Sequence, residues 1–347
     1  MAKPTDRRRF FKELLRSSAE VAGEVRSTLK AQEELGPALE PDDWFGKQVS
    51  RAEPVRHEVP VQQLLALCED VGLSERRAVA VQELLRPSLR LTAGGPAAAG
   101  PGGSRLGGTP DLPPGLDWSR SQGQELVFLA QLDLAAVAAR MPEAGLPADG
   151  LLLFFYDAER RPSGLEPSHA ASCRIVVAGT GQPLEPAPAV GATFTARPLV
   201  LSRELTLPPA HSFHLDALDL DATEFAAWAQ LRERLAELQG VVVEESCPDW
   251  LVLHRLLGHG EPMYGREMEL DCQLAANGLD LSDGEGYADP RRDELEAGAA
   301  EWRLLLQLSS DPDLGWSWSE PFGRLYFWIR ADDLIAGNFD RVWTILQ

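Results

Sequence analysis

Short apolar runs separated by turn-forming residues dominate the second part of the chain. The runs are ELVFLAQLDL (125–134), GLLLFFYD (150–157), SCRIVVAG (172–179), EWRLLLQLSS (301–310), GRLYFWIR (323–330) and DRVWTILQ (340–347). Runs of this length, rich in aromatic and β-branched residues, are typical of strands, and turn-rich connections favour antiparallel pairing. We therefore predict an α+β fold that is predominantly antiparallel β and roll-like.

Helical periodicity, in which apolar residues recur at three- and four-residue steps, marks other segments. Helices are expected at 6–34, 61–71, 74–85, 135–141 and 221–240. The last of these has the clearest ends, because Asp221 and Glu224 have the spacing of a capping box and Gly240 can stop the helix. We predict the following parts: an amphipathic helical arm (1–34), a connector with short helices (35–91), a flexible Gly/Pro/Ala loop (92–104) and a β-rich domain (105–347).

The β-rich domain contains two stretches that resemble each other. SRLG (104–107) matches HRLLG (254–258), FLAQL (128–132) matches LLLQL (304–308), and LLFF (152–155) matches LYFW (325–328). The order is the same in both stretches, and the second carries an insertion between its first and second blocks. We predict two pseudo-repeated halves, at about 105–220 and 241–347, joined by the helix at 221–240.

The charge of the chain is strongly acidic. Its net charge is -20, and residues 241–347 contain eight arginines against 21 aspartates and glutamates. Because an acidic surface repels phosphate backbones, nucleic acid is not an expected partner. Solubility is the simplest role for this charge, and binding to a basic partner is the alternative.

The stretch RRRFFK (7–12) matches a twin-arginine export motif. Export requires an apolar run of roughly 7–15 residues after the arginines, and Glu13, Arg16 and Glu20 interrupt that run here. No stretch approaches the ~20 apolar residues needed to cross a bilayer. The four cysteines have irregular spacing and no C-x-x-C pair, which suits a reducing compartment. We predict a cytoplasmic protein without a membrane span.

The same sequence blocks carry a family resemblance. SRLGGTPDLPPGLDW, ELVFLAQLDL, GLLLFFYD, LLGH and GRLYFWI occur in this order along the chain. Together they resemble the YwqG-like family of bacterial proteins over about residues 86–347. The resemblance implies a β-rich roll-like domain with accessory helices and an uncharacterised function, and it supplies no catalytic residues.

No motif in the sequence identifies a catalytic centre. The Gly-rich stretches lack phosphate-loop spacing, and no serine or cysteine has a nucleophile signature. His211 and His214 could bind a metal with Asp216 or Asp219, and the acidic loop 280–289 could bind Ca²⁺ weakly, but neither spacing is a recognised ligand pattern. We therefore assign no catalytic residue, no cofactor and no metal, and the sequence leans away from an enzyme.

Four polar residues are candidates for a ligand site in a cleft between the halves: Arg105, Gln131, His254 and Gln307. The two glutamines occupy matching points of apolar strands, where a polar side chain must be hydrogen-bonded. The alternative is that each glutamine satisfies backbone groups at the interface of the halves, and that His254 donates to a backbone carbonyl.

Other residues are candidates for partner binding. Trp316 and Trp318 lie in the loop DLGWSWSE, where exposed aromatic side chains could anchor a partner, or could instead fold over the sheet edge. The basic start of the N-terminal arm offers a second contact through Arg7, Arg8, Phe10 and Phe11.

Three functions are consistent with these features. The leading hypothesis is a cytoplasmic binding or adaptor protein that acts through protein–protein contacts. The first alternative is a small-ligand-binding protein or enzyme with a cleft between the two halves. The second is an acidic immunity-type protein that neutralises a basic partner.

Overall fold

A computed structural model describes residues 59–94, 100–179, 183–210, 212–240, 252–263, 267–319 and 323–347. The N-terminal arm at 1–34, including Arg7, Arg8, Phe10 and Phe11, lies outside these ranges, as do His211 and residues 95–99 of the loop 92–104.

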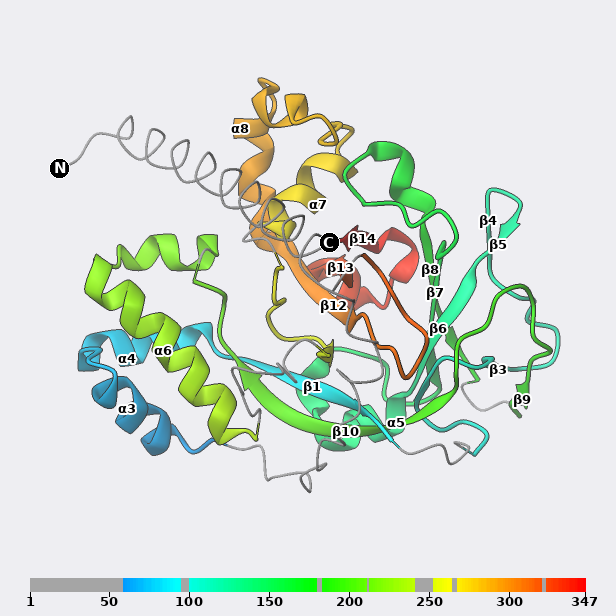
Figure 1. Ribbon diagram of the computed structural model, residues 1–347, viewed down its shortest axis with the longest axis horizontal. Coiled ribbons are helices and arrows are strands. Elements are labelled where there is room, and N and C mark those ends of the chain that lie inside the picture. The colour runs from blue at the N-terminus through cyan, green and yellow to red at the C-terminus, as the bar shows by residue number, and fades with distance from the viewer. Residues whose placement is uncertain are drawn as a thin grey trace, which may run out of the picture. The chain divides into compact units, whose positions relative to one another are not determined.

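One antiparallel sheet of ten strands organises the described residues (Figure 1). Its strands, in sheet order, are β14 (Trp343–Leu346), β13 (Arg324–Arg330), β12 (Trp302–Ser309), β11 (His254–Leu256), β1 (Arg86–Ala93), β10 (Arg197–Thr206), β2 (Arg105–Leu106), β6 (Val127–Asp133), β7 (Leu151–Tyr156) and β8 (Cys173–Ala178). Two small two-stranded sheets pair β3 (Asp111–Leu112) with β9 (Glu185–Pro186), and β4 (Arg120–Ser121) with β5 (Gln124–Glu125), and the second of these is a hairpin. The predicted α+β class with mainly antiparallel strands is confirmed.

The sheet curls until its two edges approach each other, which produces a nearly closed barrel. Ser172, beside β8, hydrogen-bonds through its hydroxyl to the Thr344 hydroxyl of β14 at 2.6 Å. The Cys173 thiol donates to the Val342 carbonyl at 3.6 Å. These contacts join the edges through side chains, so neither edge strand is left as a free template for pairing.

Both faces of the sheet are buried, and side-chain alternation distributes the strand residues between two layers. Along β7, Leu152 and Phe154 enter the barrel core, while Leu153 and Phe155 pack outside. Phe154 meets Phe327 of β13 inside the barrel, edge to face at 5.4 Å between ring centroids. Strands buried on both faces read as continuous apolar runs, which is why these strands could be predicted from the sequence.

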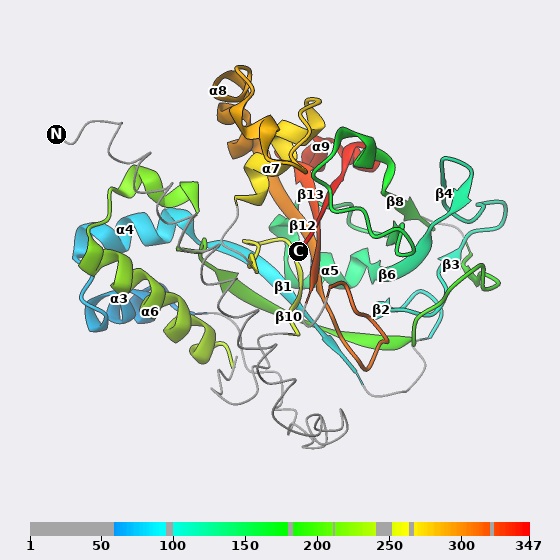
Figure 2. The same ribbon diagram turned by 45° about the horizontal axis from the view of Figure 1, so that its top comes forward.

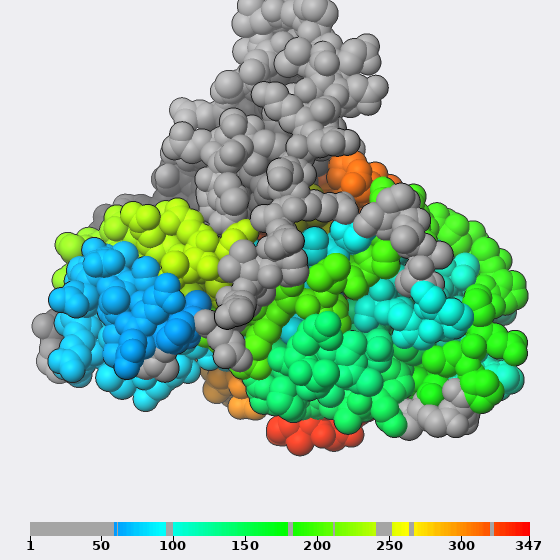
Figure 3. All heavy atoms as spheres, turned by 90° about the horizontal axis from the view of Figure 1, so that it is seen from below, coloured from blue at the N-terminus to red at the C-terminus, as the bar shows by residue number. Residues whose placement is uncertain are grey.

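Helices cover the barrel in separate groups (Figures 1 and 2). They are α3 (Val61–Asp70), α4 (Glu75–Leu84), α5 (Leu134–Arg140), α6 (Ala222–Leu238), α7 (Met268–Ala276), α8 (Arg292–Leu295) and α9 (Ala331–Ala336). The helices α3, α4 and α6 share one apolar cluster around Trp228 and form a lobe at one end (Figure 3). The helix α6 begins at a capping box of Asp221 and Glu224, as the sequence predicts.

Sequence analysis missed the strand β10, which lies at the centre of the sheet. Its sequence, RPLVLSRELT, contains a proline and three charged residues, and thus lacks the apolar run of the other strands. Glu204 in this strand is 1% exposed and is held by Arg90 of the adjacent strand β1 and Arg255 of β11, the strand beyond it. A charged residue therefore occupies a core position, where no local pattern would place it.

Candidate functional site

Two of the four predicted ligand residues lie in one buried network. Arg105 and Gln131 are directly opposite each other on β2 and β6. Arg105 pairs with both carboxylate oxygens of Asp111, each at 2.8 Å. Gln131 accepts from the Asp111 backbone N–H at 2.8 Å and donates to the Gly103 carbonyl at 3.0 Å. All of these polar groups bind partners within the protein.

The other glutamine lies in a second network with the same bonds. Gln307 is opposite Arg255 on β12 and β11. It accepts from the Glu261 backbone N–H at 2.9 Å and donates to the Leu253 carbonyl at 3.1 Å. Asp111 and Glu261 each follow their arginine by six positions, and Gly103 and Leu253 each precede it by two. The glutamine bonds use equivalent atoms at equivalent positions, whereas the arginines differ, because Arg105 pairs with Asp111 and Arg255 pairs with Glu204 at 2.7 Å.

His254, the last of the four predicted residues, makes no hydrogen bond to either glutamine. Its Nε2 lies 3.3 Å from a carboxylate oxygen of Asp311, and its Nδ1 accepts from the Ser309 backbone N–H at 3.2 Å. The expected bond from His254 to a backbone carbonyl is therefore replaced by a carboxylate contact. Neither of the two hollows described below is lined by any of the four residues.

The tryptophans proposed as a docking anchor are buried, so the expectation of exposed aromatic side chains is wrong. Trp316 and Trp318 are each 2% exposed. Phe194 meets both rings edge to face, at 5.7 and 6.3 Å between centroids. The loop folds inward because two indoles bury more apolar area against Phe194 and the barrel core than they would on the surface.

The possible metal sites gain no support in the ranges that the structure describes. Within those ranges no group of three or more His, Cys, Asp or Glu side chains is arranged to hold a metal ion. In the loop 280–289, Asp280 accepts two bonds from Ser282, and Asp289 pairs with Arg291. These acids line a shallow, open hollow and are engaged by their own loop.

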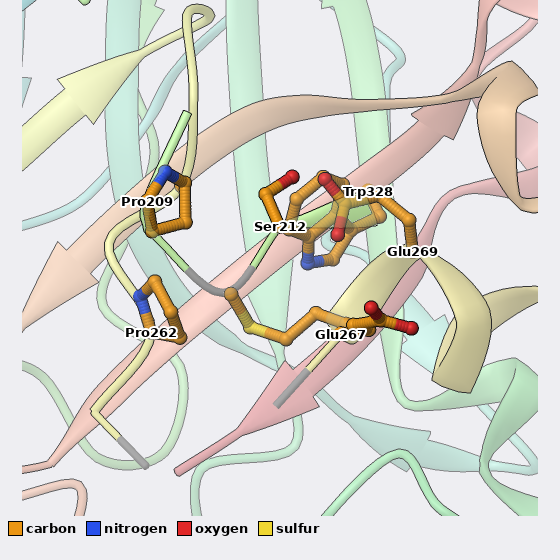
Figure 4. A pocket seen from close by; sticks show the side chains of 8 residues that line it. Pro209, Ser212, Pro262, Glu267, Glu269 and Trp328 are labelled. Carbon is orange, nitrogen blue, oxygen red and sulfur yellow. The ribbon is translucent and has the colours of Figure 1, made fainter. Parts of the chain in front are cut away.

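A more enclosed hollow lies where the chain enters α7 (Figure 4). Its enclosed part has room for about one water molecule, and the rest of its free space opens to solvent. Its lining comes from three segments that are distant in the sequence: Pro209, Ser212, Gly260, Pro262, Glu267, Met268, Glu269 and Trp328. We call it the α7 pocket.

The lining of the α7 pocket combines two carboxyl groups with an unsatisfied donor. Trp328 is 1% exposed, and its indole Nε1–H is buried without a hydrogen-bond partner. Figure 4 shows this nitrogen at the lower edge of the ring. Gly260 leaves room beside the ring, because a Cβ at this position would lie 3.2 Å from Trp328 Cζ2 and 3.4 Å from Met268 Cε. The pocket thus presents two acidic groups against apolar walls, while the indole N–H itself has almost no exposed surface.

Both carboxyl groups have unusual protonation equilibria. Burial, followed by the carboxylates of Asp216, Glu269 and Glu296, raises the pKa of Glu267 to about 7. Burial is also the main cause that raises the pKa of Glu269 to about 7, and Arg86 and Arg303 act in the opposite direction. Each group therefore changes charge near neutral pH, where ordinary glutamates are fully ionised.

The histidines beside the pocket are neutral. Burial, and then the charges of Arg86 and Arg303, lowers the pKa of His214 to about 4. Burial likewise lowers the pKa of His259 well below its ordinary value, and its Nε2 lies 2.8 Å from the Leu84 carbonyl. His214 Nε2 lies 3.9 Å from a Glu269 oxygen, but a neutral imidazole makes this contact a dipolar one rather than an ion pair at pH 7.

Sequence analysis did not identify Glu267, Glu269 or Trp328 as site residues. The available signal was the difference in length between the two similar stretches. Arg105 and Gln131 are 26 positions apart, whereas Arg255 and Gln307 are 52 apart. The extra residues include α7 and the two glutamates.

The fold and the pocket define a class of protein: an α+β protein with a curled antiparallel sheet and a small acidic pocket beside it. A family model described as a domain of unknown function, DUF1963, matches residues 104–347. The chain therefore belongs to this family. The match begins after β1, and the narrower YwqG-like assignment and a bacterial source stay predictions.

Two further findings bear on the predictions. A search of curated proteins found no match to the chain. Among the described helices, none has the length and apolar character required to cross a membrane.

Proposed function

We propose that the protein binds a small ligand in the α7 pocket, and that its barrel is built from two copies of one β unit. The matched networks of Arg105 and Arg255 support the second part of this proposal. The strand pairing supports it too. The register of β6 shifts between Phe128 and Ala130, and that of β12 shifts between Leu304 and Leu306, so each irregularity lies two residues before the glutamine of its strand.

The strand order adds to this support. On one side of the central pair β1–β10 the order is β2, β6, β7 and β8, and on the other it is β11, β12, β13 and β14. Two copies of one unit would therefore begin with β1 and β10 rather than at the predicted positions 105 and 241, because β1 pairs with β11 and β10 pairs with β2. Residues present in both halves then serve the common fold, and a specific function is expected where the halves differ.

The α7 pocket lies in such a place, since Glu267 and Glu269 belong to the extra segment between Arg255 and Gln307. The observation that carries the proposal is the pairing of these two carboxyl groups with the buried, unsatisfied indole N–H of Trp328. Because this N–H has almost no exposed surface, a ligand would have to displace neighbouring side chains to become its partner.

The adaptor and immunity hypotheses stay predictions. The residues of the N-terminal arm on which the adaptor hypothesis relied are outside the described ranges, and Trp316 and Trp318 are buried. The net charge of -20 is the remaining support for a basic partner. No feature of the described surface favours either hypothesis over a small ligand.

The test is to fill the pocket without changing its charge. Gly260→Ala adds a methyl group against Trp328 and Met268, whereas Gly100→Ala adds one where nothing lies within 4 Å. The probes are methylammonium, acetate, acetamide and methanol, added to the full chain labelled with ¹⁵N. The readout is the indole N–H resonance of Trp328, assigned among nine tryptophans by Trp328→Phe.

We expect at least one probe to shift the Trp328 resonance in a saturable way. Gly260→Ala should weaken that binding about tenfold or more, and Gly100→Ala should leave it unchanged. If none of the four probes shifts this resonance, or if Gly260→Ala binds as well as the parent chain, the pocket is not a ligand site.

A further inference from the structure

The helical lobe has an apolar core of its own. We define the lobe as the described residues of 59–85 and 207–239, which comprise α3, α4, α6 and the segment that leads into α6. Its buried apolar side chains form one cluster around Trp228, and none of them belongs to the clusters inside the barrel or beneath α7. Units with separate cores move relative to each other unless a large apolar interface joins them. The contacts between the lobe and the barrel therefore decide whether the lobe is fixed.

The lobe joins the sheet at one place. The chain enters β1 at Arg86 and leaves β10 at Thr206, and these two residues are directly opposite each other. Figures 1 and 2 show α3, α4 and α6 beyond this shared end of the two strands. Two neighbouring connections form a short axis on which a body can turn without breaking any strand pair. A third connection, at 241–251, lies outside the described residues.

Two buried side chains hold the lobe close to this axis. Gln239, which follows α6, accepts from the Leu205 N–H at 2.6 Å and donates to the Leu205 carbonyl at 3.0 Å. His259 Nε2 lies 2.8 Å from the Leu84 carbonyl. Leu205 and Leu84 are one and two positions from the residues at which β10 ends and β1 begins. Because these contacts lie so near the axis, a turn of the lobe would change their lengths little.

An ion pair joins the lobe to the barrel farther from the axis. Arg232 of α6 pairs with Glu261, which follows β11. Arg232 is seven residues from Gln239, about 10 Å along the helix. The two side chains are 22% and 28% exposed, so water and salt reach the pair and its contribution is small. Glu261 itself is fixed to the barrel, because Gln307 accepts from its backbone N–H at 2.9 Å.

The α7 pocket lies between the lobe and the rest of the protein. Pro209 and Ser212 come from the segment that leads into α6, whereas Glu267 precedes α7 and Trp328 belongs to β13 (Figure 4). A turn of the lobe would separate these two walls. It would also give solvent access to the Trp328 indole N–H, which is otherwise buried.

We infer that the lobe turns as one body on the connections at Arg86 and Thr206, and that the Arg232–Glu261 pair is the latch that holds it closed. This inference concerns the protein without a ligand and goes beyond the proposed function. The separate apolar cores, the single place of attachment and the partly exposed ion pair carry it.

The distance between the two bodies is the direct measurement. Spin labels are attached through Val79→Cys on α4 and Ile335→Cys on α9, two exposed positions, in the full chain with Cys247→Ser. The three cysteines within the described ranges are buried and do not compete for the label. We expect two populations of label distances, one for the closed and one for the open lobe. A second pair of labels, through Leu65→Cys and Val79→Cys, lies within the lobe and should give a single distance throughout.

The variant that tests the latch is Arg232→Gln. It should raise the ratio of open to closed molecules about fivefold, the factor that corresponds to a pair worth about 1 kcal/mol. Hydrogen exchange of the Trp328 indole N–H should become faster by the same factor. Arg234→Gln is the matched control, because Arg234 lies on the same helix and pairs with Glu237 within the lobe, so it should change neither quantity.

Salt tests the latch without any substitution in it. At 1 M NaCl the screening length falls to about 3 Å, which weakens a partly exposed ion pair. The chain with Arg232 intact should then show the same rise in the open population as Arg232→Gln, and the variant should respond to salt less. An effect of salt in the unsubstituted latch cannot come from misfolding of the variant.

The outcomes separate this inference from the proposed function. A single distance between Val79 and Ile335 that neither Arg232→Gln nor salt alters would overturn the inference. A change in the label pair within the lobe would also overturn it, because the lobe would then be unfolding rather than turning. If the lobe opens and none of the four probes shifts the Trp328 resonance, the proposed function fails and the inference stands. If a probe binds while the distance is constant, the reverse holds.

Discussion

Replacing Glu204 with glutamine is expected to destabilise the protein by about 3–5 kcal/mol, the cost of breaking a buried ion pair from one side. Glu204 is 1% exposed on β10. Its carboxylate accepts from Arg255 at 2.7 Å and from Arg90 at 2.6 and 2.9 Å. The variant leaves two guanidinium groups facing a neutral amide between the central strands.

The measurement is urea or guanidinium unfolding of the full chain at neutral pH. Glu125→Gln is the matched control, because Glu125 pairs with Arg120 on the surface hairpin β4–β5. An exposed pair of this kind contributes less than about 1 kcal/mol. Equal effects of the two substitutions would mean that the arginines around Glu204 are adequately solvated without it.

The same group gives stability a pH dependence on the acid side. Burial alone would raise the pKa of Glu204, but Arg255 and Arg90 outweigh it and hold the pKa below its ordinary value. A carboxyl with a lowered pKa in the folded state stabilises the protein above its ordinary pKa of about 4.3. That contribution is lost as the pH falls through the lowered folded value. In Glu204→Gln, the free energy of unfolding should fall less steeply below pH 4.3 than in the parent chain.

The second large effect is expected at the two buried glutamines. Gln131→Leu and Gln307→Leu each leave a backbone N–H without its acceptor, at Asp111 and Glu261 respectively. Unsatisfied buried groups cost about 1–3 kcal/mol each, so we expect a loss of about 2–4 kcal/mol in each variant. Gln131→Leu should cost more, because Asp111 also loses a bond from the amide and Ser309 still donates to the Leu253 carbonyl.

This experiment separates a structural role from a ligand role. Gln124→Leu on the exposed strand β5 is the control and should lie within about 0.5 kcal/mol of the parent chain. In both glutamine variants, the Trp328 resonance should respond to methylammonium as in the parent chain, provided that the protein is folded. If a variant is stable but no longer binds the probe, the substituted glutamine, Gln131 or Gln307, contributes to ligand binding. If the substitution leaves the free energy of unfolding unchanged at only one of the two glutamines, the two halves are not equivalent.

Several features of this protein follow from its sequence alone. The strands β7, β12 and β13 are continuous apolar runs, because both of their faces are buried, and such runs can be recognised locally. The start of α6 is likewise encoded nearby, in Asp221 and Glu224. The matching positions of Gln131 and Gln307 also appear in the sequence, and their burial makes a hydrogen-bonded role a physical requirement.

Other features depend on contacts between distant segments. The strand β10 holds Glu204 in the core only because Arg90 and Arg255 approach from β1 and β11. Trp316 and Trp318 are buried because Phe194, more than 120 positions earlier, covers them. The α7 pocket joins Ser212, Glu267 and Trp328, whose spacing in the chain suggests no common site.

The physical reason is the range of the interactions concerned. Side-chain alternation, helix periodicity and capping act over a few residues, so the sequence determined most of the strands and helices. Burial and charge pairing depend on which elements meet, so the tertiary structure decided the protonation of Glu267 and Glu269, the missing partner of the Trp328 indole and the place where a ligand can bind.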